Sequence, residues 1–579
     1  MSPLRTLLVA LLPLTLVDIA LAQEKKPGAP APAPDNPRYA EALARYKDCI
    51  TRIPFRYHTD GRERLAETRE MEAFRILSQD YVKSDDYPEY TRYTLGSLFG
   101  RHFTKSEFVD GLDALRKAND KPVDTWMWVK ALKCKIDAVG DAEAIEIAQT
   151  DKNVLHRAAA IAAIGESRNG NLKAVILPIC ADFPKKEYER YMLLGAMSGA
   201  LIENKRRVND EEYREALTAY IGLLGEEVDL PHTAKVQMAR HLHLIVGGPA
   251  LFINQQPWLD LLKGGDVKAP QKGHTVVAPR FFGVETEGER FCYVIDMSDS
   301  MLMPISPGAR PPEPSGPVTG PRQPPKKKKR ELLDEEDLPW DKIKNRWDLA
   351  REHLKISLWR LTPDKHFAVV WFGDESGTLD SCKGMIKATK GNVDRVVAEL
   401  DSIKPIKPEE APAREGHTKR KGVGPEGKVL RGNTNMHSGV KRAFGLAGKG
   451  FVEEFAYVDP EALTEGCDTI FLLSDGAPTM DDFYVSDKDY GEGNVVEDQE
   501  TATPAQRTPR LWYPGPYAQD DWLVEDVRRM NAFRRIRLHT IGLGEANDAL
   551  MSRLAEIGRG EYCPVGKKKA EAADGGSKK

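Results

Sequence analysis

Cysteine is scarce in this sequence, and no two cysteines stand at metal-binding spacing. The chain has 579 residues and seven cysteines, none of them in a C-x-x-C pair: Cys49, Cys134, Cys180, Cys292, Cys382, Cys467 and Cys563. This scatter argues against a structural zinc site and against a disulfide-dense scaffold. An odd number leaves at least one thiol unpaired within an exported chain, and we expect most of them to be buried as small hydrophobic side chains.

Long apolar runs are also rare, and one stands at the start of the chain. Residues 1–22, MSPLRTLLVALLPLTLVDIALA, carry Arg5, an apolar stretch and the ending Ala20-Leu21-Ala22. This pattern predicts an export signal with an A-x-A cleavage site. A membrane anchor is the alternative, but the run is short and Asp18 interrupts it. Because no later stretch is apolar enough to span a bilayer, we expect an exported protein that is periplasmic, envelope-associated or secreted.

A strong excess of one charge is missing as well. The chain has 84 Lys and Arg against 88 Asp and Glu, which leaves a formal net charge of -4. Binding to a phosphate backbone needs a basic surface, so we expect no nucleic acid partner. The hydrophobic fraction of 41% is that of a globular protein. The chain is too long to fold around one ordinary hydrophobic core, so we expect two or more domains.

The first half of the chain has a helical pattern. Residues 23–37 are a Pro/Ala-rich linker, and residues 38–264 have few strand signals. Three segments rich in small and aliphatic residues start roughly 40 residues apart, the period of a two-helix HEAT-type unit; they are residues 154–166, 191–203 and 234–247. Small residues there would let helices approach closely and stack into a solenoid, with an irregular helical bundle as the alternative. A second linker is predicted at residues 265–280.

The pattern changes to alternating strands and helices over residues 281–566. Short continuous apolar runs suit strands buried on both faces of a parallel sheet; they are residues 291–296, 366–372, 469–475 and 537–543. Apolar residues at three- and four-residue spacing predict helices at 344–361 and 546–558, with Gly558 ending the second. The fold class predicted for this part is therefore α/β, with a doubly wound parallel sheet.

Oxygen-bearing side chains follow directly after one of these strands, in the stretch VIDMSDSM. Asp296 closes one predicted strand and Asp475 another, so both carboxylates should reach the edge outside the carboxyl ends of the strands. Ser298 and Ser300 alternate with Asp296, and Thr434 in GNTNMHSGV precedes a predicted helix. Two carboxylates and three hydroxyls suit a hard divalent cation, with Mg²⁺ as the first choice. We expect neither aspartate to be a core packing residue.

DMSDSM, GNTN and LLSDGAPT together resemble the von Willebrand factor type A (VWA) domain with its metal-ion-dependent adhesion site. The family pattern, Asp-x-Ser-x-Ser followed by Thr and Asp on separate loops, is matched by Asp296, Ser298, Ser300, Thr434 and Asp475. The resemblance covers about residues 281–565. It implies a non-catalytic protein-binding module that holds Mg²⁺, with Mn²⁺ or Ca²⁺ as alternatives, whose shell is completed by a carboxylate of a protein ligand.

One position departs from the family pattern. The residue between the two serines, often Gly in the family, is Asp299 here, and we expect its side chain to face water. Asp tolerates unusual backbone angles better than most residues, so the loop should keep its conformation.

Two insertions interrupt the α/β part, at residues 302–339 and 478–521, and a low-complexity tail covers residues 567–579. The first insertion contains the acidic run ELLDEED, residues 331–337. An acid from this run could occupy the open metal position, although a solvated charge run is the simpler interpretation. The aromatic residues of the second insertion either form a contact surface for a partner or hold the loop on its own domain.

Two other functions stay open. A metal-independent scaffold would bind its partner through the helical repeats, and a chelator would leave that binding intact. A metal-dependent hydrolase is less favoured, because Asp-x-Asp phosphatases need a second carboxylate where Ser298 stands. The sequence has no G-x-S-x-G or H-E-x-x-H motif, and His437 and Ser438 are adjacent on a predicted helix, so they diverge.

Overall fold

The computed structural model describes most of the chain. The described residues are 36–83, 87–247, 253–265, 279–309, 338–405, 429–430, 432–452, 457–487 and 511–566. The predicted export signal, nearly all of the Pro/Ala linker, the acidic run 331–337 and the tail lie outside them, as does most of the linker 265–280.

The part of the chain from Pro37 to Leu262 is helical, as predicted. Its α-helices are α2 (Pro37–Cys49), α3 (Phe55–Glu67), α4 (Met71–Lys83), α5 (Pro88–His102), α6 (Val109–Ala118), α7 (Thr125–Val139), α8 (Ala142–Thr150), α9 (Val154–Glu166), α10 (Leu172–Ala181), α11 (Glu187–Glu203), α12 (Glu211–Gly222), α13 (His232–Val246) and α14 (Gln255–Leu262). The three segments singled out in the sequence are α9 and the larger parts of α11 and α13. Among these helices none is long and apolar enough to cross a bilayer, and the same holds for every other described helix.

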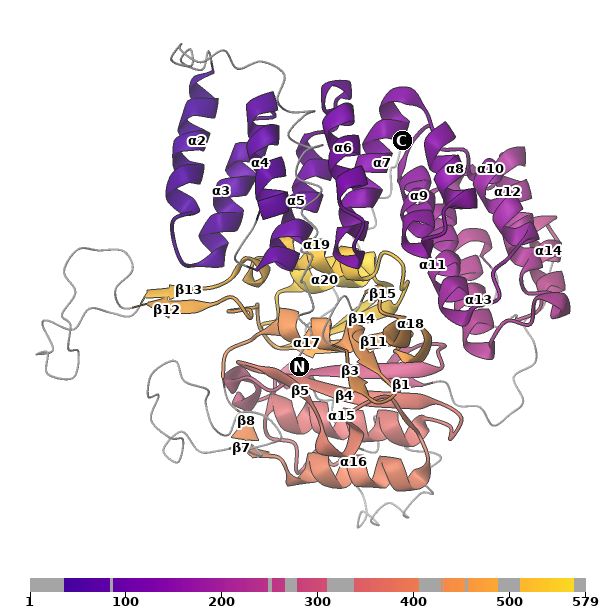
Figure 1. The fold of residues 1–579 in the computed structure, drawn as a ribbon. Helices are drawn as coiled ribbons and strands as arrows, with labels where there is room; N and C mark the ends of the chain where they lie inside the picture. The colour runs from indigo at the N-terminus through magenta and orange to yellow at the C-terminus, as the bar shows by residue number, and fades with distance from the viewer. Residues whose placement is uncertain are drawn as a thin grey trace, which may run out of the picture.

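These helices pack as pairs in two layers (Figure 1). Helices α3, α5, α7, α9, α11 and α13 form an inner row in which neighbours contact one another, and the remaining helices pack behind them. Asn153 begins α9 by accepting the backbone N–H of Leu155 at 3.0 Å. Gly165 of α9 allows the close approach of α11, since a Cβ there would lie 2.5 Å from Ala200. The predicted role of small residues in helix packing is confirmed at this contact.

The second part of the chain is a mostly parallel sheet of seven strands. In the order β15-β14-β11-β3-β4-β5, the first five are parallel, while β5 and β6 pair antiparallel with β4. The strands are β3 (Arg290–Asp296), β4 (His366–Phe372), β5 (Ser376–Thr378), β6 (Ile386–Lys387), β11 (Thr469–Ser474), β14 (Arg537–Leu543) and β15 (Arg559–Val565). All four predicted strands are confirmed, and β3, β4 and β11 are buried along nearly their whole length.

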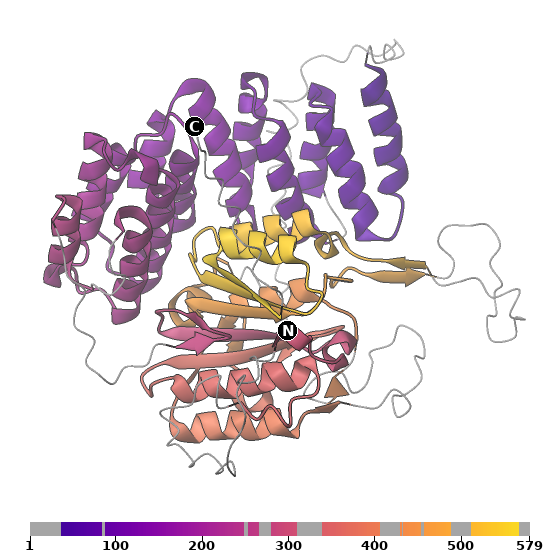
Figure 2. The ribbon, with the colours of Figure 1, turned by 180° about the vertical axis from the view of Figure 1, so that it is seen from behind.

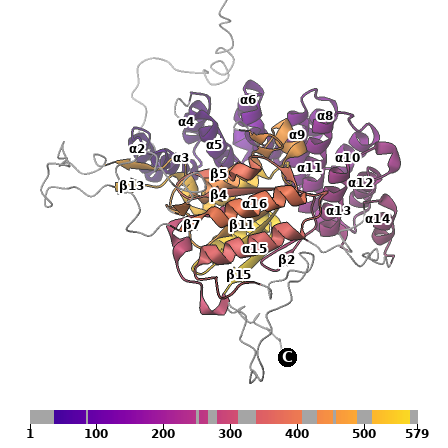
Figure 3. The same ribbon diagram turned by 90° about the horizontal axis from the view of Figure 1, so that it is seen from below.

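Helices cover both faces of this sheet, which makes the architecture Rossmann-like. Helices α15 (Arg346–Arg360) and α16 (Lys390–Ser402) lie on one face, which Figure 3 shows from below. The other face carries α17 (Met436–Phe444), α18 (Pro460–Glu465), α19 (Asp520–Met530) and α20 (Asp548–Ile557). Strand β3 alternates between the two cores, with Tyr293 in one and Val294 in the other. The predicted helices α15 and α20 are confirmed, and Gly558 is the C-cap of α20.

Short two-stranded pairs complete the described structure. They are β1 (Arg280–Phe281) with β2 (Val284–Glu285), β7 (Lys404–Pro405) with β8 (Val429–Leu430), β9 (Leu446–Ala447) with β10 (Gly450–Phe451), and β12 (Val485–Asp487) with β13 (Leu511–Tyr513). The last pair lies in the second insertion and extends from the body of the molecule (Figure 1).

The inner row of helices lies directly on the α/β region, above α17 to α20 (Figures 1 and 2). One hydrophobic core continues from the helical region through this layer to the sheet. Gly195 of α11 permits the close approach, since a Cβ there would lie 1.8 Å from the carbonyl oxygen of Phe533. Arg240 of α13 forms a buried ion pair at 3.1 Å with Asp468, which directly precedes β11.

The aromatic residues of the second insertion contribute to the same contact. The ring of Phe483 lies 5.0 Å from Phe55 and 4.6 Å from Tyr90, and Tyr517 lies 5.8 Å from Tyr90. These side chains therefore pack on the helical region of the same chain, which neither alternative included. Tyr517 also stacks on His437 of the α/β region at 4.2 Å, so the alternative that the aromatic residues hold the loop on its own domain is confirmed in part.

Candidate metal centre

The carboxyl ends of β3 and β11 bring Asp296 and Asp475 to the same edge of the sheet. Strand β3 lies between β4 and β11, and the chain first crosses to β4 and only later returns to the other side, at β11. The direction of winding thus reverses between β3 and β11, which is where doubly wound sheets bind their ligands. Asp296 is the last residue of β3, and Asp475 directly follows β11.

A continuous set of hydrogen bonds joins four of the five predicted ligands. The backbone N–H of Ser298 donates to Oδ1 of Asp296 at 2.9 Å, which turns the loop back over the strand end. The hydroxyls of Ser298 and Ser300 are 3.0 Å apart. Ser300 in turn donates to Oδ1 of Asp475 at 2.6 Å, across a sequence separation of 175 residues.

Thr434 reaches the same edge from the loop that precedes α17. Its backbone N–H donates to Oγ1 of Thr479 at 2.9 Å, and the N–H of Thr479 donates back to its carbonyl oxygen at 3.0 Å. Its hydroxyl lies 4.0 Å from the position that a Cβ on Gly476 would take. Thr434 is therefore held beside the loop that carries Asp475, so the structure places all five predicted residues at one edge.

Asp299 has a more definite role than the sequence indicated. Its side chain is exposed as predicted. Its Oδ1 also accepts the backbone N–H of Gly432 at 2.9 Å, and its own N–H donates to the Gly432 carbonyl at 3.0 Å. These bonds join the loop that carries Ser298 and Ser300 to the loop that carries Thr434. The five-residue motif alone does not reveal this contact.

Both carboxylates are buried, although they belong to neither hydrophobic core, in keeping with the expectation that neither is a core packing residue. Asp296 is 0% exposed and Asp475 is 1% exposed, because the loops that follow their strands fold over the sheet edge. Burial, with the neighbouring charge of Asp475, raises the pKa of Asp296 to about 7. The hydroxyl of Ser474 donates to Oδ2 of Asp296 at 2.7 Å. Two neighbouring buried acids need a compensating positive charge.

Arg346, a residue that the sequence motif does not include, supplies part of that charge. Its Nη1 donates to Oδ2 of Asp475 at 2.8 Å. It is the first residue of α15, and it follows the first insertion in the sequence. Only a tertiary contact identifies it, because a lone arginine at a helix start carries no signal for a metal site.

The donor set fits a hard divalent cation. In the described part of the chain, no group of three or more His, Cys, Asp or Glu side chains is placed to hold a metal ion. Any cation at this edge would therefore use hydroxyl oxygens together with the two aspartates. Such all-oxygen sets are typical of Mg²⁺ and Ca²⁺, and the residues present fit the ion that the sequence predicts.

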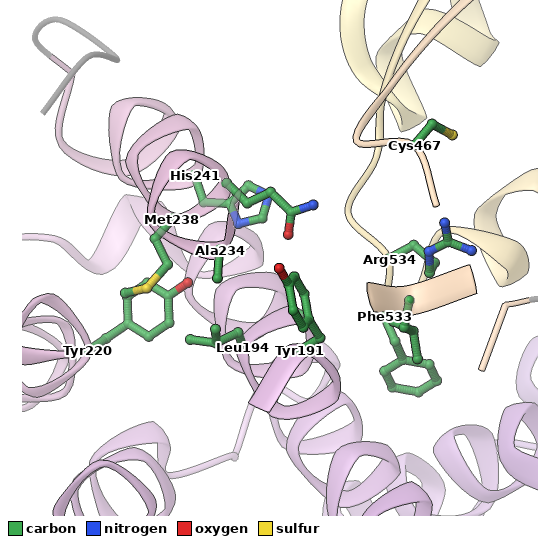
Figure 4. Close-up of a pocket in the computed structure, with 12 residues that line it drawn as sticks. Tyr191, Leu194, Tyr220, Ala234, Met238, His241, Cys467, Phe533 and Arg534 are labelled. Atoms are coloured by element: carbon green, nitrogen blue, oxygen red, sulfur yellow. The ribbon is translucent and has the colours of Figure 1, made fainter. Parts of the chain in front are cut away.

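Two other places in the molecule have side chains of chemical interest. His437 bonds through Nε2 to Asp526 at 2.8 Å, whereas Ser438 bonds to Ser376 at 2.7 Å, so the neighbours point to different partners. A cavity of about 10 Å³, enough for about one water molecule, lies between the helical region and the segments before β11 and β14 (Figure 4). Tyr191 and His241 line it on one side, and Arg534 lines it on the other.

The sequence matches no protein-family model, and no curated protein matches it. The function of the chain is therefore inferred from its residues and their geometry.

Proposed function

We propose that this chain is an exported, non-catalytic protein-binding module of the VWA type, which captures an acidic group of a protein ligand through a divalent cation. The observation that carries the proposal is the bonded set Asp296–Ser298–Ser300–Asp475 at the winding reversal of the sheet, with Thr434 beside it. We also propose that the helix pairs of residues 38–264 form a HEAT-type solenoid, supported by the two-layer packing.

The chemistry of this donor set favours binding over reaction. Asp475 is already paired with Arg346, so the two carboxylates do not fully neutralise a bound divalent cation, which attracts an anion from outside. The serines and Thr434 would hold the ion, with the aspartates binding directly or through water. Mg²⁺ is the first choice, and Mn²⁺ or Ca²⁺ are the alternatives.

Titration calorimetry of the purified chain with Mg²⁺, Mn²⁺ and Ca²⁺ tests the proposed cation site. We expect uptake of one ion per chain and loss of that uptake in Asp296→Asn. Asp521→Asn is the control, because that carboxylate is 80% exposed and pairs with Arg553 at the surface. Absence of uptake of all three ions by the wild-type chain would overturn the proposal.

The proposed partner is tested by pull-downs from envelope extracts with Mg²⁺ or with a chelator. Proteins that are retained by wild type with Mg²⁺, and lost with either chelator or Asp296→Asn, support a cation-bridged carboxylate. Retention in the chelator supports the metal-independent scaffold instead. The inner row of helices already packs on the α/β region, so such a scaffold would have to use the outer row.

The hydrolase alternative has its own test. The place of a second phosphatase carboxylate is taken by Ser298, whose hydroxyl bonds Ser300 at 3.0 Å. Turnover of a phosphoester by the purified chain that disappears in Asp296→Asn would replace the binding function by an enzymatic one.

A further inference from the structure

Arg346 engages one of the two candidate metal-binding carboxylates. Its Nη1 donates to Oδ2 of Asp475 at 2.8 Å, while Ser300 occupies Oδ1 of the same carboxylate at 2.6 Å. The side chains of this ion pair are 9% and 0% exposed. Both oxygens of Asp475 are therefore committed within the protein, and a guanidinium charge lies inside the candidate site.

The backbone around the site holds this guanidinium in place. The N–H of Arg346 donates to the carbonyl oxygen of Met303 at 3.0 Å, and Pro304 forms an isolated antiparallel β-bridge with Asn345. These contacts hold the segment that follows Ser300 against the start of α15. On the other side lies Gly544, with φ of +56°, where a Cβ would stand 2.5 Å from Nη2 and 2.6 Å from Cζ. A side chain at this position would displace the guanidinium. Glycine in the loop after β14 therefore leaves the space that the guanidinium of Arg346 occupies.

Folding stability does not account for this arrangement. A buried ion pair contributes little net stability, because removing both charges from water offsets most of their attraction. Among the described residues, Nε of Arg346 is also buried without a hydrogen-bond partner, which destabilises the fold. A buried guanidinium with an unused donor, placed at a candidate ligand site, indicates a functional role.

We propose that Arg346 sets the charge of the site and thereby makes it selective for an acidic ligand group. This inference rests on the proposed cation-dependent function. With both carboxylates ionised, as cation binding requires, Asp296, Asp475 and Arg346 together carry one net negative charge, which a divalent cation converts into one net positive charge. Without the guanidinium, the same cation would leave the site neutral. Arg346 therefore weakens cation binding and strengthens the attraction of the loaded site for a carboxylate.

The two effects have opposite signs, and a purely structural role of Arg346 would not produce them. Arg346→Met removes the charge and keeps an extended side chain, whereas Arg346→Lys keeps the charge and is the matched control. We expect Arg346→Met to bind Mn²⁺ about tenfold more tightly and the Mn²⁺-loaded protein to bind acetate about tenfold more weakly. Arg346→Lys should stay within about threefold of wild type in both measurements.

Electron paramagnetic resonance of Mn²⁺ gives the first affinity, and acetate titration of the Mn²⁺-loaded protein by water-proton relaxation gives the second. If Arg346→Met does not fold, Gly544→Ala serves instead, because its methyl group displaces the guanidinium. Unchanged affinities, or loss of both in a folded variant, would overturn the role of Arg346. Absence of Mn²⁺ binding in the wild type would instead overturn the proposed function itself, and this inference with it.

Discussion

Asp296 shows how the surroundings of one residue determine what its substitution will do. Its Oδ1 accepts the N–H of Ser298, and its Oδ2 accepts the hydroxyl of Ser474. An asparagine can keep both contacts, because its carbonyl oxygen accepts the N–H and the serine hydroxyl can rotate to accept from the amide. Asparagine is thus the informative substitution at this buried position, whereas alanine would also leave a void.

We expect Asp296→Asn to keep or raise the stability of the metal-free chain, by up to about 1 kcal/mol, because it relieves repulsion with buried Asp475. The same substitution should abolish the thermal stabilisation that Mg²⁺ gives to the wild type. Thermal unfolding with Mg²⁺ and with chelator measures both effects. An equal Mg²⁺-induced shift of Tm in the variant would exclude Asp296 as a ligand.

Asp481 makes stability depend on pH. Burial raises the pKa of its carboxyl to about 6, although it accepts the N–H groups of Phe483 and Tyr517, each at 2.7 Å. An unfolded aspartate has a pKa of about 3.9, so the folded chain holds this proton to higher pH than the unfolded chain. The contribution to stability is therefore present below about pH 4 and is lost as pH rises through about 6.

We expect Asp481→Asn to remove this loss, which amounts to at most about 3 kcal/mol between pH 4 and pH 7. The variant starts from a lower stability, because its amide accepts only one of the two N–H groups. Urea unfolding of both chains across this pH range gives the difference. Parallel pH profiles would show that Asp481 does not titrate in this range.

At the scale of elements, the strands and helices follow the sequence pattern closely. The continuous apolar runs became β3, β4, β11 and β14, because strands between two helical layers have no polar face. The insertion at residues 478–521 did not follow from the pattern. Its aromatic residues meet helices α3 and α5, which are more than 380 residues earlier in the chain, and no local periodicity records such a contact.

Phe483 tests whether this insertion is part of the core. Its ring lies among Phe55, Tyr87 and Tyr90 and is 6% exposed. We expect Phe483→Ala to lower the free energy of unfolding by about 3–5 kcal/mol, as for a core aromatic residue. Chemical denaturation measures the change.

The control for Phe483→Ala is Val139→Ala, because Val139 is 70% exposed. It should change stability by no more than about 0.5 kcal/mol. A cost of less than about 1 kcal/mol for Phe483→Ala would mean that the insertion is not anchored on the helical region.

At the scale of the whole molecule, the helical and α/β regions share one hydrophobic core. Buried polar contacts cross the same boundary. Asp468 accepts Arg240 at 3.1 Å from the helical side and the N–H of Glu289 at 2.8 Å from its own side. Arg529 lies 3.6 Å from the ring centroid of Tyr93. We therefore expect that the helical and α/β regions cannot come apart while either of them stays folded.

We expect the chain to unfold in one cooperative transition, and Arg240→Ala to destabilise both regions together by about 3–5 kcal/mol, because Asp468 would stay buried without its partner. Amide hydrogen exchange followed at α9 and at β11 measures both regions. Arg528→Ala is the control, since its ion pair with Glu525 is on the surface. Loss of protection in α9 alone would show two independent domains.

The sequence by itself determined the two kinds of architecture and the five oxygen-bearing residues that meet at one edge of the sheet. Hydrophobic periodicity is a local property, and strand ends of a parallel sheet necessarily meet at one edge. Only the tertiary structure decided that Asp296 and Asp475 are buried, that Arg346 pairs with Asp475, and that the inner helices lie on the α/β region. These features depend on contacts between residues far apart in the chain, where the free energy comes from packing and charge pairing that no local pattern encodes.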